Sequence, residues 1–477
     1  MALRCQGPAR VDETFGRFWS SGRGGSGSSA RRRVPPKGVM SAKLMRPIAL
    51  CATLTIPAVL FRLSGGHPPA TLGLLVFGTA VVASSFLLAW AAEAARVDIS
   101  GPLAIAILAV VAVLPEYAVD LYFAYTAGHD PSYVAYAAAN MTGSNRLLLG
   151  LGWPVVVITA VAVASRRSGQ TVRELILGSR YRVELGFLLI ASIAAFAVPV
   201  TGQISLILGF ALLGFFVFYL WKASQAETSE PDLVGPAARI GSLPARGRRP
   251  LVAVLFLWAA VVIVISAEPF ASSLISTGTE LGIDKFLLVQ WVAPLASESP
   301  EFIVAILFAV HGKGADAIGT LLSSKVNQWT LLVGSLPIAY LAGGGASALT
   351  LDPRQVEEFL LTAAQTLLGV SALLTLRFPR WLAFTLLGLF AVQYAFPGQA
   401  ARYVLCVIYG VIAVAALARN HRHIWPTLAA PFRPPPGHPE GSAPVPSPSA
   451  AGNGSGTPRS REPAPAGLSA GPVNPAG

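Results

Sequence analysis

The chain has 477 residues, of which 53% are hydrophobic and only 12% are charged. Soluble domains carry about 25% charged residues, so this composition excludes an ordinary soluble protein and favours a polytopic membrane protein. The formal net charge of +12 does not indicate nucleic-acid binding, because Lys and Arg lie in the tails and in the loops between apolar segments. The three cysteines (Cys5, Cys51 and Cys406) are too widely spaced to suggest a disulfide framework or a thiolate metal site.

The two ends of the chain differ from its middle. Residues 1–45 are rich in Gly, Ser and Arg, and residues 419–477 are rich in Pro, Gly, Ser and Ala. We predict both segments to be disordered, because neither buries enough apolar surface to offset the entropy of ordering. The first segment does not have the pattern of a secretory signal.

Twelve apolar segments lie between these ends, and we predict that each crosses the bilayer as a helix of about 20 residues. They cover residues 47–61, 70–92, 101–127, 132–164, 185–200, 203–221, 251–275, 285–310, 317–342, 359–376, 382–396 and 403–418. The segments group into a first transmembrane half (46–221), a linker (222–249) and a second half (250–418).

Positive charge in alternate loops predicts the orientation of these spans. The basic loops, expected in the cytoplasm, contain Arg166, Arg167, Arg173, Arg180 and Arg182, then Lys222, Arg239, Arg246, Arg248 and Arg249, then Arg377 and Arg380, and finally Arg419 and Arg422. The intervening loops, such as 201–203 and 352–358, contain few Lys or Arg residues. Twelve spans with both termini in the cytoplasm of a plasma-membrane protein agree with this bias.

Two segments of the chain resemble each other. The first reads AVVAVLPEYAVDLYFAYTAG (109–128) and continues to residue 154, and the second reads WVAPLASESPEFIVAILFAVHG (291–312) and continues to residue 337. Each has a Pro-Glu pair in an apolar helix, followed by a helix with small polar residues. These Pro-Glu helices are the third and eighth spans, so an odd number of steps separates them and they run in opposite directions. We therefore predict an inverted repeat with its site near the midplane of the membrane.

The residue types of the two repeats favour cation chemistry. Pro115 and Pro300 each remove a backbone donor, which leaves carbonyl groups that are tolerated at this depth only beside a polar cavity. Glu116 and Glu301 place carboxylates beside those carbonyls, and hard cations such as Ca²⁺ and Na⁺ prefer oxygen ligands of this kind.

This pattern resembles the alpha repeats of the sodium/calcium exchanger superfamily of cation antiporters, which read roughly T-S-x-P-E and then G-S-x-x-x-N. The resemblance covers about 45 residues in each half. It implies two inverted five-helix units, formed here by spans two to six and seven to eleven, with two extra helices. It also implies alternating access, with Glu116 and Glu301 as the metal ligands. We thus expect an all-α polytopic membrane protein with about ten core helices.

The match to the motif is uneven. In the second repeat Ser297 matches a family hydroxyl and Glu298 replaces the next one, while Ser324 fits the spacing of the following helix. In the first repeat Ala112 and Val113 replace both hydroxyls.

Two registers align the first repeat with the second. One pairs Ser144 with Ser324 and places Leu148 opposite Gln328. The other pairs Asn145 with Gln328, and we prefer it because it needs the smaller insertion and keeps an amide at that position. The candidate cation ligands under the two registers are Glu116, Glu301, Asn145, Ser324, Gln328, Asn140, Ser144, Ser323, Ser297, Glu298 and Asp120.

Two bases accompany the acidic side chains of the site. Arg146 and Lys325 lie on the helices that follow the Pro-Glu helices. A buried charge at mid-bilayer is costly, so we expect pairing, for example Asp120 with Arg146 and Glu298 with Lys325. The two added positive charges predict fewer cation sites than in a three-sodium exchanger, and the remaining carboxylates make proton coupling plausible.

These observations predict a secondary antiporter that exchanges Ca²⁺ or another cation for Na⁺ or H⁺. No enzymatic activity, cofactor or nucleic-acid partner is expected; the lipid bilayer and small cations are the expected partners, and a homodimer is left open. The rival interpretations are a cation channel, a membrane enzyme using Glu and Asp as acid and base, and a transport-inactive scaffold or sensor. The residues missing from the first motif keep the last of these open.

Overall fold

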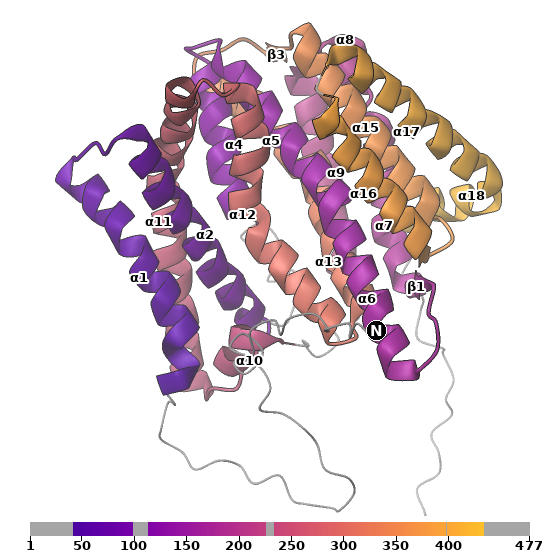
Figure 1. Cartoon of the computed structure of the whole chain (residues 1–477), viewed down its shortest axis with the longest axis horizontal. Helices are drawn as coiled ribbons and strands as arrows, with labels where there is room; N and C mark the ends of the chain where they lie inside the picture. Colours follow the sequence, from indigo (N-terminus) through magenta and orange to yellow (C-terminus); the bar gives the residue numbers. More distant parts are fainter. Residues whose placement is uncertain (1–41, 99–112, 226–232, 397, 434–477) are drawn as a thin grey trace, which may run out of the picture. The chain divides into compact units, whose positions relative to one another are not determined.

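The computed structural model describes residues 42–98, 113–225, 233–396 and 398–433. Within those residues the chain is almost entirely helical (Figure 1). Nine helices in this part of the chain are long and apolar enough to cross a membrane by length and composition. Most of the predicted amino-terminal arm and carboxy-terminal tail, the start of the third apolar segment with Ala112, and residues 226–232 of the linker lie outside the described residues.

The helices of the first half follow the predicted apolar segments. They are α1 (Ala42–Ser64), α2 (Ala70–Ala95), α4 (Leu114–Ala127), α5 (Tyr133–Leu147), the π-helix η1 (Leu148–Gly152), α6 (Trp153–Ser168), η2 (Ser179–Tyr181), α7 (Arg182–Ala194), α8 (Ala197–Thr201) and α9 (Leu206–Ala223). Pro115 stands in the first turn of α4, where its missing N–H costs no helical hydrogen bond.

The second half repeats this order. It contains α11 (Ala245–Leu281), α12 (Lys285–Val310), α13 (Gly314–Asn327), the π-helix η3 (Gln328–Leu332), α14 (Val333–Ala342), α15 (Pro353–Leu373), α16 (Arg380–Ala395) and α17 (Gln399–Arg419). Pro300 lies inside the continuous helix α12, unlike Pro115 at the start of α4.

Two segments outside the predicted spans are also helical. The predicted linker contains α10 (Gly235–Gly241), and α11 begins within it. Residues 421–432, expected to be disordered, form α18 (His421–Ala429) and η4 (Ala430–Phe432). Disorder was expected for lack of buried surface, but α18 packs on α7, and Arg182 donates a hydrogen bond to Thr427 Oγ1 at 3.1 Å.

Four short strands show how the halves are related. β1 (Glu174–Ile176) pairs antiparallel with β4 (Arg377–Pro379), and β2 (Gln203–Ser205) pairs antiparallel with β3 (Ala348–Thr350). β3 follows β1, and β4 follows β2, by the same 174 positions. β3 is therefore the equivalent of β1, and β4 is the equivalent of β2. Because β1 pairs with β4 and β2 pairs with β3, the two pairs exchange under the repeat, as expected for two units related by a two-fold axis.

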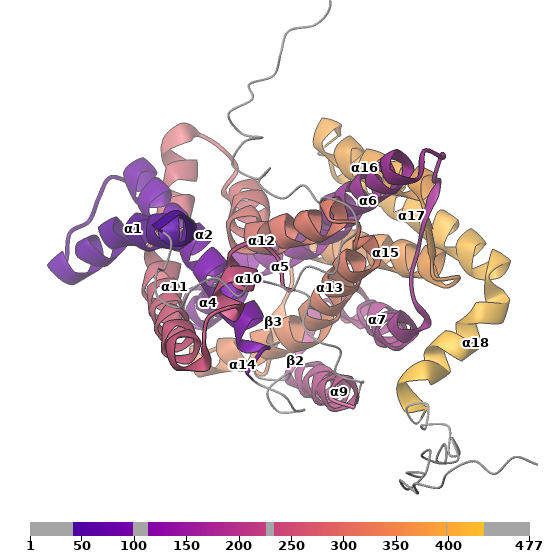
Figure 2. The same cartoon turned by 90° about the horizontal axis from the view of Figure 1, so that it is seen from below.

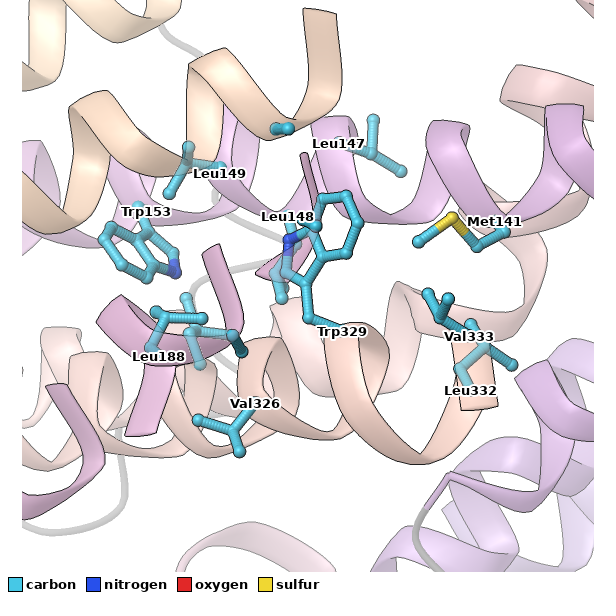
Figure 3. Packing of buried hydrophobic residues seen from close by; sticks show 14 of the residues in the cluster. Met141, Leu147, Leu148, Leu149, Trp153, Leu188, Val326, Trp329, Leu332 and Val333 are labelled. Atoms are coloured by element: carbon cyan, nitrogen blue, oxygen red, sulfur yellow. The ribbon is translucent and has the colours of Figure 1, made fainter. Parts of the chain in front are cut away.

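The π-helices give the register of the repeat. Both have five residues, and η3 begins 180 positions after η1. This spacing pairs Ser144 with Ser324 and Leu148 with Gln328, so the preferred register, which paired Asn145 with Gln328, is not supported. The apolar side chains around these π-helices pack together: Figure 3 shows Met141 and Leu148 of the first half near Trp329 and Val333 of the second.

Outside this centre, α2 packs along α11 and α1 covers both, as the two views show (Figures 1 and 2). Arg62 of α1 forms an ion pair with Glu268 of α11 at 2.7 Å, and Trp258 donates to Thr55 Oγ1 at 3.0 Å. Beyond the end of α2, the guanidinium groups of Arg248 and Arg249 hold the pKa of Asp98 down at about 2.

Candidate cation site

The two Pro-Glu carboxylates come from opposite halves and lie close enough for their charges to interact. Glu116 is in the first turn of α4 and is buried, whereas Glu301 lies in the second half of α12 and is partly buried. The negative charges of Asp120 and Glu298 also act on Glu116. The inverted arrangement therefore brings acidic groups of both repeats together, in a low-dielectric region where each needs a counter-charge or a proton.

Gln328 connects the carboxylates of the two halves. Its Nε2 donates to Glu298 Oε1 at 2.6 Å and to Glu116 Oε1 at 3.2 Å. The side chain is buried at the first position of η3. Ser324, one turn earlier, donates its hydroxyl to Glu301 Oε2 at 2.5 Å. One face of α13 and η3 thus hydrogen-bonds to three carboxylates.

The polar stretch of α5 lies on the other side of these carboxylates. Ser144 lies beside Glu116 and Glu298, and Asn140 faces Asp120. Several buried polar atoms of this group have no hydrogen-bond partner within the described residues: Asp120 Oδ1 and Oδ2, Asn140 Oδ1 and Nδ2, Ser144 Oγ, Glu298 Oε2 and Gln328 Oε1. Unpartnered buried oxygens are costly, so this set has the ligand capacity that a cation would use.

Two candidate ligands lie differently from expectation. Ser297 donates its hydroxyl back to Ala293 O at 3.2 Å, within its own helix. Ser323 lies against Tyr219 of α9 rather than beside the Pro-Glu carboxylates. Neither hydroxyl is directed at a carboxylate of the site, which leaves Ser144 and Ser324 as its hydroxyl groups.

The predicted pairing of Asp120 with Arg146 is wrong. The Arg146 guanidinium forms a buried ion pair with Glu358 of α15 and donates to Gln393 Oε1 of α16. Arg402 of α17 also pairs with Glu358, at 2.8 Å. Glu358 was not among the predicted site residues, because residues 352–358 were expected to form a loop; instead Asp352 caps α15, and Glu357 and Glu358 lie inside this helix. The signal for this in the sequence is that the two acids directly precede a long apolar run.

Lys325 lies at the centre of the site. Its Nζ donates to Asn145 O at 2.5 Å and to Asn145 Oδ1 at 2.8 Å, and its side chain is fully buried. The charges of Glu298 and Glu116 act on it, but no ion pair with Glu298 forms within the described residues. The expected Glu298–Lys325 pair is therefore a longer-range attraction.

Carboxylates alone do not complete a metal site here. In the part of the chain that the structure describes, no group of three or more His, Cys, Asp or Glu side chains is placed to hold a metal ion. Ca²⁺ takes six to eight oxygen ligands. A bound cation would therefore need further oxygen ligands in addition to Glu116 and Glu301, and Ser144, Ser324 and Gln328 lie beside these carboxylates.

Comparisons with known proteins show the family and the fold of the chain. The model of the family described as sodium/calcium exchanger protein matches residues 69–224 and 251–397. The crystal structure of the H⁺/Ca²⁺ exchanger CAX is 41% identical, with a TM-score of 0.76, and the match covers 82% of this chain and 98% of that one.

Two more distant structures share the fold. Native YfkE is 15% identical, with a TM-score of 0.54 over 77% of this chain and 99% of its own. The selenium-substituted Ca²⁺/H⁺ antiporter protein YfkE is 15% identical, with a TM-score of 0.51 over 78% and 100%. No curated protein matches the chain significantly. The family match covers α2 to α9, then most of α11 and the helices from α12 to α16, but neither α1 nor α17. This supports ten core helices with two additions.

Proposed function

Because the chain belongs to the sodium/calcium exchanger family, we propose that it exchanges Ca²⁺ or a similar cation for H⁺ by alternating access, with Glu116 and Glu301 as its central ligands. Na⁺ is the second candidate for the counter-ion. The contact of Gln328 with Glu116 carries the proposal, because this bond joins the second half to the first at the carboxylate site. Inverted repeats with a site between them are the architecture of alternating access.

The preference for H⁺ has two supports. The H⁺/Ca²⁺ exchanger CAX is 41% identical to this chain, whereas the two YfkE structures are 15% identical. In addition, Lys325 is the only basic side chain among the described residues whose charge acts on Glu116 and Glu298, since Arg146 is paired with Glu358. Carboxylates gathered in this way must be accompanied by cations or protons, so loss of one favours uptake of the other.

The membrane orientation is part of the proposal. β1 and β4 join two loops that the charge pattern assigns to the cytoplasm, while β2 and β3 join two loops assigned to the other side. Both pairings agree with the alternation of loops expected for twelve spans, and cytoplasmic termini in a plasma membrane are proposed with it. They support the alternation of the loops, and the Lys and Arg bias supplies its direction.

The test is flux in proteoliposomes with an imposed pH or Na⁺ gradient and a panel of Ca²⁺, Mn²⁺, K⁺ and Na⁺. We expect saturable Ca²⁺ uptake driven by the pH gradient, reduced to the level of empty liposomes by Glu116→Gln and by Glu301→Gln. Glu280→Gln, at an exposed position near the end of α11, is the matched control and should transport normally. Uptake that survives both site substitutions would refute the proposal, and flux without counterflow would favour a channel.

A further inference from the structure

Lys325 contacts Asn145, the residue at the equivalent position of the other half. Asn145 and Lys325 are 180 positions apart, the same spacing as the two π-helices, so they occupy equivalent positions in the two halves. Equivalent residues touch each other only near the axis that relates two repeats. The contact therefore lies at the centre of the transport domain, between α5 and α13.

The oxygens that receive the ammonium group have the character of cation ligands. Asn145 O belongs to the last turn of α5, which passes into the π-helix η1 three residues later. This carbonyl accepts the backbone N–H of Leu148 and uses its second lone pair for the ammonium group. Backbone carbonyl and amide oxygens are also the groups that replace the hydration shell of alkali-metal ions.

The surroundings of Lys325 would suit a free cation as well. The charges of Glu298 and Glu116 act on its ammonium group. Ser144 lies between these two carboxylates, and the buried atoms Ser144 Oγ, Glu298 Oε2 and Gln328 Oε1 have no partner among the described residues. Without the ammonium group, these oxygens and those of Asn145 would form a negatively charged, oxygen-rich site.

We propose that the Lys325 ammonium group is a tethered cation that fills a monovalent-cation site formed by Asn145 O and Oδ1 and the neighbouring oxygens. The inference rests on the proposed antiport function, because the position that the Lys325 ammonium group fills belongs to the proposed cation site. The protein consequently needs no Na⁺ at that position. Removal of the ammonium group opens the position to an ion of the same charge.

The first test measures Na⁺ binding by Lys325→Met in detergent. We expect NaCl to raise the melting temperature of this variant above its value in the same concentration of N-methylglucamine chloride, with saturation, because an ion that binds only the folded state stabilises it. The wild type and the control variant Lys285→Met should not respond. In the double variant Asn145→Ala/Lys325→Met, the Na⁺ concentration that gives half of the rise in melting temperature should be about 10-fold higher or more, because a ligand side chain is lost.

A folded Lys325→Met that shows no specific response to Na⁺ would overturn the inference. Where this variant is not recovered, Lys325→Ala purified in Na⁺ and in N-methylglucamine provides the second comparison, and recovery in Na⁺ alone supports a site. Recovery of neither variant in Na⁺ counts against it, because the ion should replace the missing charge. Flux by the wild type tests the antiport function separately, so transport without a Na⁺ response in the variants rejects only the tethered cation.

Discussion

Arg146 illustrates how a side chain near a functional site can serve the structure around it. It is adjacent to Asn145, but its guanidinium turns away to Glu358 and Gln393, on helices α15 and α16. Arg402 of α17 pairs with the same glutamate. The network joins α5 to the helix that lies beyond the family match, and it removes the charge of Arg146 from the cation site.

Removing Arg146 alone should destabilise the protein more than removing the charges of both Arg146 and Glu358. We expect Arg146→Met to lower the free energy of unfolding by about 3–5 kcal/mol, because it leaves two buried glutamates with Arg402 alone. The double variant Arg146→Met/Glu358→Gln should recover much of this loss, since Glu357 and Arg402 then balance. Melting temperatures of the purified variants measure both effects, and a double variant that is less stable than the single one would contradict the role assigned to Glu358.

The side chains of the site were predictable from the sequence to differing degrees. Glu116 and Glu301 followed from Pro-Glu pairs in apolar helices, and Gln328 from the spacing of the motif. The partners of Arg146 and Lys325 did not, because a charge count says that buried charges must be neutralised but not by which helix. Ser297 and Ser323 have the right residue type and spacing, yet helix rotation directs one to its own backbone and the other towards Tyr219.

At the scale of helices, α5 and α12 approach so closely that their backbones touch. A Cβ atom placed on Gly143 would lie 1.8 Å from Gln290 O, a distance that no side-chain movement relieves. Gly143 stands between Thr142 and Ser144, in the stretch that lines the site. The small residue is what allows α5 to present its polar face to the carboxylates of α4 and α12.

Gly143→Ala should therefore separate the two helices and impair transport. We expect flux to fall at least about 10-fold, together with a loss of stability in the range of about 1–3 kcal/mol typical of overpacking. Gly388→Ala is the matched control, because a Cβ there meets open space within α16 and helix propensity favours Ala by roughly 0.5–1 kcal/mol. Flux assays and thermal melts of both variants check this, and normal flux by Gly143→Ala would show that the close contact is unnecessary.

The helix order was predictable because apolar runs and turn residues mark most spans directly. The register between the repeats was not predictable from the sequence. The register with the shorter insertion was preferred, but helix packing constrains the alignment more strongly than insertion length does. The π-helices at 148–152 and 328–332 fix the equivalence through backbone geometry, and they align the apolar Leu148 with the polar Gln328. The site is thus less symmetric than its scaffold, with its amide bridge supplied by one half alone.

At the scale of the whole transmembrane unit, two inverted halves exchange contacts in a reciprocal way. Each half supplies one strand to each of the two β pairs, and each supplies acidic residues to the central site. Opposite helix direction followed from counting spans between the Pro-Glu pairs, and the strand pairings support that count independently. The additional helices α1 and α17 attach to this core through the Arg62–Glu268 pair and the Arg402–Glu358 pair, respectively.

The central claim is that Glu116 and Glu301 act on one and the same ion, and a double-mutant cycle of equilibrium binding tests it most directly. Binding of the transported cation is measured for the wild type, Glu116→Gln, Glu301→Gln and the double variant. We expect each single substitution to weaken binding by about 10- to 100-fold, and the double variant to bind little more weakly than either, with a coupling energy above about 0.5 kcal/mol. Losses that simply add, or binding unaffected by either substitution, would contradict a shared site.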